Sequence, residues 1–293
     1  MDDAQAVARI RALPCWRSEV TVAPLGGGLT NHNYLVSDGA DRRVARLGED
    51  IPVHHVLRFN ELAASRAAHA AGLSPAVLHV EPGVTVFEYV DARTYGEEDV
   101  RAPGALERIV PLIRRCHREV PDHLRGPALV FWVFHVIRDY AATLRDGGSA
   151  HAALLPGFLD IAARLEADAG PFDIVFGHND LLAANFLDDG DRLWLIDWDY
   201  AGFNSPLFDL GGLASNNGLS EAQETRMLEL YFEAPADDAL LRRYHAMKCA
   251  SLLRETMWSM VSEITSALDL DFAAYTAENL TRFRAAHSDY MNS

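Results

Sequence analysis

The chain has 293 residues, of which 42 are acidic and 26 basic, so its net charge at pH 7 is −16. This charge argues against nucleic acid or an anionic membrane as the main partner. The three cysteines are far apart and form no CxxC pair, which argues against a disulfide framework or a zinc site. The acidic start of the sequence and the lack of a long apolar run predict a cytoplasmic protein without a membrane span.

A glycine-rich turn separates two strand-like runs near the start of the sequence, after a short amphipathic helix predicted over residues 2–13. Gly26, Gly27 and Gly28 let the backbone approach a ligand closely, and backbone N–H groups in such a turn can hold phosphate oxygens. With Asn31, they are candidates for nucleotide binding. Taken alone, three glycines are explained better by a plain hairpin turn.

The next predicted strand, residues 42–47, carries a cation. Arg46 follows Val44-Ala45 in a run that resembles the V-A-I-K strand of kinases, and its guanidinium can grip phosphate oxygens in a bidentate way. Glu61 lies in a predicted helix over residues 56–71 and is a candidate for orienting Arg46. The alternative is an arginine on a solvated edge strand.

A strand pair follows over residues 77–80 and 84–90, joined by a turn at Pro82-Gly83. In a two-lobed kinase this is the place of the hinge between the lobes. Backbone groups between Glu88 and Val90 are therefore expected to meet the adenine ring. An ordinary core strand remains an alternative for this segment.

From about residue 100 the sequence turns helical, because Pro103 and Gly147-Gly148 fall where helices begin and end, and Ser220 opens a capping box. A strand-rich first third and a helical remainder predict an α+β, bilobal fold. Its small antiparallel-sheet lobe would span residues 1–90 and its larger, mostly helical lobe residues 91–293. The predicted helices cover residues 104–119, 133–146, 156–168, 220–233, 237–266 and 271–288.

The most specific motif starts at His178. Asp180 and Asn185 are five residues apart, and Asp197 follows a short predicted hairpin twelve residues later. Phosphoryl transfer needs a carboxylate that accepts the proton of the attacking hydroxyl, and an amide oxygen with a second carboxylate that hold magnesium. Each residue alone is more simply a turn or cap residue, but the full set at this spacing indicates a phosphotransfer site.

With these residues, the chain resembles the aminoglycoside phosphotransferase-like small-molecule kinases, and among them the choline/ethanolamine kinase branch. The resemblance implies a protein-kinase-like fold, ATP and Mg²⁺ as cofactors, Asp180 as catalytic base, and Asn185 and Asp197 as magnesium ligands. It also implies that Arg46 grips the phosphates and that Asp199, next to Tyr200, lies near a cationic head group. Asp209 corresponds to an acid that braces the catalytic loop.

One position departs from the choline kinase pattern. That branch often carries two tryptophans three residues apart on a late helix, whereas this chain has Glu255 and Trp258. Residues three apart share a helix face, so both side chains are expected to contact the acceptor. A carboxylate with one aromatic ring suits an ammonium that donates hydrogen bonds at least as well as a trimethylammonium. Core packing is the alternative for Trp258.

The sequence thus predicts a Mg²⁺- and ATP-dependent kinase for the hydroxyl of a small cationic alcohol, with choline or ethanolamine as the leading acceptors. One alternative keeps the fold and changes the acceptor to an aminoglycoside, thiamine, a sugar or homoserine. Another is a nucleotide-binding pseudokinase without turnover. A homodimer is compatible with the sequence, and no nucleic-acid partner is expected.

Overall fold

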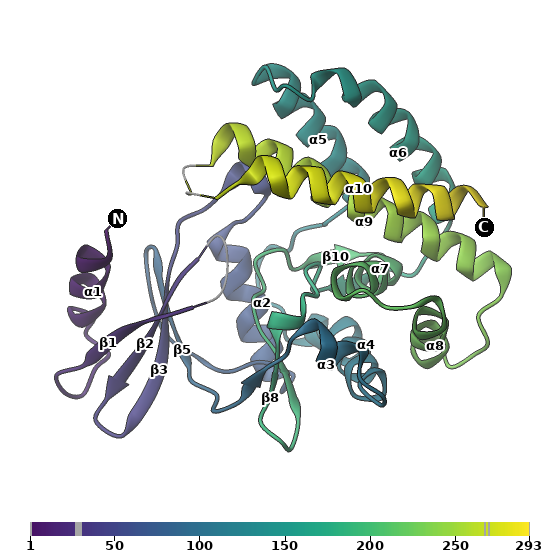
Figure 1. The fold of residues 1–293 in the computed structure, drawn as a ribbon. Helices are drawn as coiled ribbons and strands as arrows, with labels where there is room; N and C mark the ends of the chain where they lie inside the picture. Colours follow the sequence, from purple (N-terminus) through teal and green to yellow (C-terminus); the bar gives the residue numbers. More distant parts are fainter. Residues whose placement is uncertain (1, 27–30, 267, 269, 293) are drawn as a thin grey trace.

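The computed structural model describes residues 2–26, 31–266, 268 and 270–292. Two of the predicted turn glycines, Gly27 and Gly28, therefore lie outside the described residues. Figure 1 shows a sheet with a short helix at one end of the molecule and a larger, mostly helical part at the other. This arrangement confirms the predicted α+β, two-lobed fold. The division at residue 90 stays a prediction.

Five antiparallel strands form the sheet of the smaller lobe, in the order β1-β2-β3-β5-β4, so β3 is the central strand. Helix α1 (Asp3–Arg11) packs on this sheet through Ile10, which shares a buried cluster with Val36, Ala45 and Val86. Alternating side chains of β2, β3 and β5 thus face α1, as the two-residue period of a strand requires. The strands are β1 (Thr21–Leu25), β2 (His32–Asp38), β3 (Asp41–Leu47), β4 (Val77–Glu81) and β5 (Val84–Glu88).

Helix α2 (Arg58–Ala70) joins the sheet to the helical lobe. It contacts both β4 and α4 (Leu106–His123), and its buried Ala64, Ala67 and Ala68 belong to the core of the larger lobe. Small side chains on this face let the two helices approach closely. The predicted helix over 104–119 is in fact α4, which begins later and continues through Pro121 to His123.

The larger lobe is built around α9, which contacts α5, α6, α7 and α10. Sixteen residues of α9 are buried, which is why its sequence lacks a clear polar face. The sequence analysis missed α7, whose Gly211 and Gly212 weaken a helical pattern. A Cβ at Gly211 would lie 2.8 Å from the Cα of Lys248, so glycine is required where α7 crosses α9. The remaining helices are α3 (Glu97–Arg101), α5 (Val133–Asp146), α6 (Leu155–Ala169), α7 (Pro206–Asn217), α8 (Glu221–Phe232), α9 (Asp238–Thr265) and α10 (Phe272–Asn292).

Short strands between the helices flank the predicted catalytic residues. The predicted hairpin is present, with Phe186 paired to Leu195 across it. Among the described residues, no helix is both long and apolar enough to cross a bilayer. These strands are β6 (Arg93–Thr94), β7 (Val175–Gly177), β8 (Phe186–Asp188), β9 (Leu193–Leu195) and β10 (Gly202–Asn204), and the 3₁₀ turns are η1 (Pro52–His54), η2 (Ala152–Leu154) and η3 (Ala183–Asn185).

Candidate active site

The loop that carries Asp180 follows β7, and Asp209 of α7 binds its backbone. One carboxylate oxygen of Asp209 accepts the backbone N–H of His178 at 2.8 Å, and the other accepts that of Asn179 at 2.6 Å. His117 of α4 contacts the same carboxylate at 2.9 Å. Asn179 has a φ of 65°, a conformation that is unfavourable for most residues. The buried carboxylate therefore fixes the backbone that presents Asp180, as the bracing role expected for Asp209 requires.

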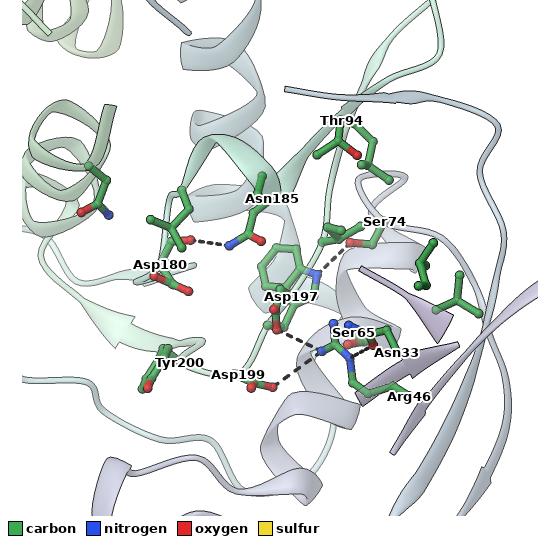
Figure 2. Close-up of a pocket in the computed structure, with 18 of the residues that line it drawn as sticks. Asn33, Arg46, Ser65, Ser74, Thr94, Asp180, Asn185, Asp197, Asp199 and Tyr200 are labelled. Carbon is green, nitrogen blue, oxygen red and sulfur yellow. Dashed lines mark hydrogen bonds and ion pairs between the residues drawn. The ribbon is translucent and has the colours of Figure 1, made fainter. Parts of the chain in front are cut away.

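Asp180, Asn185 and Asp197 come together beside the hairpin. Asn185 donates its side-chain N–H to the backbone oxygen of Asp180 at 2.8 Å, which leaves its amide oxygen as an acceptor. Ile196 donates its backbone N–H to the backbone oxygen of Asn185 at 3.0 Å, so the end of the hairpin lies beside its start. Asp197 follows at once with a φ of 69°. Figure 2 shows Asp180 and Asn185 next to each other, with Asp197 below them.

Arg46 projects from β3 towards this group. Its Nη1 lies 2.8 Å from Oε1 of Glu61 and 2.9 Å from Oδ1 of Asp197, while Nε donates to Asn33 at 3.2 Å. The ion pair predicted between Arg46 and Glu61 is thus confirmed. The alternative of a solvated edge-strand arginine is wrong, because β3 is the central strand and Arg46 is only 9% exposed.

A second arginine, Arg58 of α2, completes this network and was missed in the sequence. Its Nη1 lies 2.6 Å from Oε2 of Glu61 and 2.9 Å from Oδ1 of Asp199. Asp199 also accepts a hydrogen bond from Asn31 at 3.0 Å and is 3.7 Å from Arg46. Asp199 therefore contacts the arginine network and also lines the cavity, and its place near the acceptor stays a prediction.

One cavity of about 570 Å³ joins the two lobes at this site. One wall of the cavity includes Gly26 and the segment 88–90, which the sequence analysis assigned to phosphate and adenine binding. Asn31 and Glu61 lie behind this wall, bonded to Asp199 and Arg46. Apolar side chains suited to enclose a flat ring also line the cavity, among them Val44, Phe87, Leu187 and Ile196.

The other side of the cavity is lined by Tyr200 and by residues of α9 and α10. Glu255 and Trp258 both line it, as their spacing predicted, and Tyr275 and Arg254 join them. Trp258 donates its indole N–H to the Tyr200 hydroxyl at 3.0 Å, and Tyr275 donates to Oε1 of Glu255 at 2.8 Å. Trp258 is largely buried, so core packing and a contact with the cavity are combined in one side chain.

Burial, together with the nearby charges, shifts the pKa of the central carboxyl group of the site. Burial raises the pKa of Asp180 to about 8, and the nearby charge of Asp197 adds to this rise while Arg254 opposes it. Burial and Asp197 also raise the pKa of Asp199, against the opposing effect of Arg46. A carboxyl group with its pKa near neutrality is typical of a proton-transfer group in a functional site.

The oxygen atoms at Asn185 and Asp197 fit a magnesium ion. Mg²⁺ prefers oxygen ligands and takes one or two from the protein when substrate phosphates and water supply the rest. Asp197 keeps 20% of its side-chain surface exposed, although Arg46 contacts one of its oxygens. When bound, such an ion would neutralise phosphate charge next to Asp180.

Sequence analysis missed three side chains of this site: Arg58, Arg254 and Tyr275. Arg254 had a visible signal, because it interrupts an apolar helix segment directly before Glu255. Arg58 had a weaker one, three residues before Glu61 on the same helix face. Tyr275 contacts Glu255 from a different helix, so only the fold could bring the two together.

Comparison with known proteins decides the family. The model of the family described as "Phosphotransferase enzyme family" matches residues 21–247. The chain belongs to this phosphotransferase family. Membership identifies it as a small-molecule kinase, and the relatives described next confirm the resemblance to the choline/ethanolamine kinase branch.

Two relatives and one solved structure illustrate the similarity. Protein LicA of Haemophilus influenzae is 28% identical over 218 residues, which are 70% of this chain and 61% of the relative, so the match spans about three fifths of that protein. Ethanolamine kinase 2 of Mus musculus is 26% identical over 95% of this chain and 80% of its own length. The crystal structure of a choline/ethanolamine kinase family protein from Mesorhizobium loti is 31% identical, covers 98% of this chain and 95% of its own, and superposes with a TM-score of 0.78.

Proposed function

We propose that this phosphotransferase transfers the γ-phosphoryl group of ATP, with Mg²⁺, to the hydroxyl of a small alcohol that carries an ammonium group, with choline or ethanolamine as leading acceptors. The observation that carries the proposal is the meeting of Asp180, Asn185 and Asp197 in one cavity with Glu255 and Trp258. The relatives named ethanolamine kinase and choline/ethanolamine kinase family protein support the same acceptor class.

Each residue has a role that follows from its position. Asn185 and Asp197 would hold Mg²⁺, and Arg46 would grip the phosphates from the central strand. Asp180 would align the acceptor hydroxyl and take its proton as the new phosphate ester bond forms. Because the pKa of Asp180 depends on its neighbours, added positive charge beside Asp197 would lower it and favour the ionised base.

Aromatic and acidic side chains would select the ammonium group. Trp258, Tyr200 and Tyr275 offer ring surfaces on the acceptor side of the cavity, and cations bind favourably to such faces. Glu255 adds a negative charge in the same wall. The intact set Asp180, Asn185 and Asp197 favours turnover over a pseudokinase. The cytoplasmic location and the homodimer stay predictions.

The test is release of ADP with Mg-ATP and a panel of choline, ethanolamine, its methylated forms, thiamine and kanamycin. We expect saturable turnover on an ammonium alcohol, and a fall in kcat of about 10²- to 10⁴-fold in Asp180→Ala. The matched control is Asp160→Ala, which removes an exposed carboxylate on α6 and should behave as the unaltered protein. Equal turnover in the unaltered protein and Asp180→Ala would rule out the proposed base.

A further inference from the structure

Two consecutive residues of opposite charge stand in the acceptor wall of the cavity. Nη1 of Arg254 lies 3.0 Å from Oε2 of Glu255, and both side chains line the cavity. Arg254 is only 5% exposed, and its guanidinium carbon lies 4.4 Å from the centre of the Tyr200 ring. A charged side chain this deeply buried is rarely kept without partners for all its donors.

Arg254 has more donors than partners. Its Nε and Nη2 are buried and make no hydrogen bond within the described part of the chain. The phenol of Tyr140 interacts with the guanidinium, and Glu255 is its ion-pair partner, so the charge has partners while the Nε and Nη2 donors do not. Nε and Nη2 form one edge of the planar guanidinium, and this edge matches the two oxygens of a carboxylate. Unpaired buried donors of this kind point to a ligand group that pairs with them.

We propose that the acceptor is a hydroxylated α-amino acid, whose carboxylate binds Arg254 while its ammonium binds Glu255. The inference rests on the proposed function, because it keeps the phosphoryl transfer to a hydroxyl and adds one group to the acceptor. It differs from a choline-type acceptor, which offers nothing to an unpaired guanidinium edge.

The spacing of the two charges favours an α-amino acid over other zwitterions. The charged groups of Arg254 and Glu255 touch at 3.0 Å, so they complement an ammonium and a carboxylate that are attached to the same carbon. The other contact of Glu255 is the neutral hydroxyl of Tyr275, at 2.8 Å, which leaves the carboxylate able to accept from an ammonium. Asp180 lines the same cavity and would receive the hydroxyl.

Access to the guanidinium edge requires a small movement. Nε and Nη2 are covered in this structure, and the ring of Tyr200 lies against the guanidinium. Arg254 already lines the cavity, and we infer that a change of its rotamer presents this edge to the ligand. Side-chain rotamer changes of this kind are common when a ligand binds, even where the backbone stays in place.

Three matched pairs of acceptors test the inference, since each pair differs by one carboxylate: serine with ethanolamine, homoserine with 3-aminopropan-1-ol, and threonine with 1-aminopropan-2-ol. With Mg-ATP, we expect at least one amino acid to exceed its partner by about 10- to 100-fold in kcat/KM. Arg254→Gln should remove this preference, and Arg254→Lys should restore part of it, because lysine keeps the charge without the bidentate edge. If Arg254→Gln does not fold, the unaltered protein and Arg254→Lys still decide the matter.

Arg282→Gln is the matched control. This arginine also lines the cavity, but its Nη1 and Nη2 are bonded to Asn279 and to the backbone oxygen of Ser215, so the preference should persist in the variant. A preference lost in Arg282→Gln and kept in Arg254→Gln would overturn the assignment.

The outcomes separate the inference from the proposed function. Equal or better turnover of the amino alcohols by the unaltered protein would overturn the inference and leave the proposed function standing. No turnover of any acceptor would contradict the proposed function, and calorimetric binding of serine against ethanolamine would then decide the inference. Tighter binding of serine, lost in Arg254→Gln, would support it, and equal binding would overturn it.

Discussion

The two ends of the cavity differ in how completely their charges are paired. At the phosphate end, Arg46 and Arg58 are held by three carboxylates, those of Glu61, Asp197 and Asp199, at distances of 2.6–3.7 Å. Of the guanidinium nitrogens of these two arginines, only Nη2 of Arg58 is buried without a hydrogen bond among the described residues. At the acceptor end, Arg254 has one charged partner and two unpaired nitrogens. The first arrangement keeps its geometry before any ligand arrives, which suits a reaction in which positioning dominates catalysis. The second leaves a charge available for the acceptor, which suits the choice of substrate.

Removal of Arg46 should have the largest effect, because it takes the shared cation away from two buried acids, Glu61 and Asp199, and from the partly exposed Asp197. We expect Arg46→Met to lower the free energy of unfolding by about 3–5 kcal/mol, the usual cost when a buried ion pair loses one partner. Denaturant unfolding measures this. Arg42→Met is the control, since the ion pair of Arg42 is with the exposed Asp91 on the surface. A loss in Arg46→Met no larger than that of the control would contradict the account.

Asp209→Asn should weaken the hydrogen bonds that hold the backbone of the catalytic loop. The buried carboxylate accepts two backbone N–H groups and contacts His117, and its pKa is lowered by these contacts with His117 and His178 although burial opposes this. Hydrogen bonds to a charged group contribute about 1.5–3 kcal/mol each, so we expect a loss of about 2–3 kcal/mol in stability. Turnover should fall with it, while the affinity for ATP, measured by calorimetry, should change little. An unchanged kcat would show that the loop holds its shape without this brace.

Asp180→Asn should gain stability relative to the unaltered protein as the pH rises. Burial raises the pKa of Asp180 in the folded protein to about 8, above its value of 3.8 in an unfolded chain. The contribution of this carboxyl group to the stability of the folded state is therefore full below pH 3.8 and is lost as the pH rises through 8. Between pH 5 and pH 8 the difference should grow by about 3–4 kcal/mol in favour of the variant. Thermal melts without metal or nucleotide at several pH values measure this, and a difference that does not vary with pH would contradict it.

Tyr275→Phe should give the smallest effect of these variants, and it tests the acceptor end of the cavity. The variant removes the hydroxyl that donates to Glu255 at 2.8 Å but keeps the ring in the wall. A hydrogen bond to a charged group contributes about 1.5–3 kcal/mol, and since Tyr275 acts on the ammonium only through Glu255, we expect the KM of the acceptor to change by about tenfold. The KM for ATP should stay as it is. Steady-state kinetics with each substrate varied in turn would show whether the change is confined to the acceptor.

The sequence allowed the phosphate end to be predicted better than the acceptor end. Asp180, Asn185 and Asp197 lie in one short stretch, so their spacing already predicted that a hairpin brings them together. Arg46 and Glu61 were paired correctly from neighbouring elements of the same lobe. These contacts depend on local structure, which periodicity and motif spacing describe well.

The rest depended on contacts between distant parts of the chain. Arg58 meets Asp199 across 141 positions of sequence, and no local pattern connects them. The contacts of Asp199 with both arginines were not foreseen, and its predicted place near the acceptor stays a prediction. Helix α7 was missed because Gly211 and Gly212 lower helix propensity, while the close crossing with α9 requires the first of them. Packing between elements decided each of these cases.

The measurement that tests the central claim most directly is ³¹P NMR of a reaction with Mg-ATP and the preferred acceptor from the panel. The account predicts a phosphate monoester signal of the acceptor that grows in equal amount with ADP, and neither signal in Asp180→Ala. ADP that forms together with inorganic phosphate alone, or monoester that forms equally in Asp180→Ala, would contradict the claim that Asp180 directs the phosphoryl group to an alcohol.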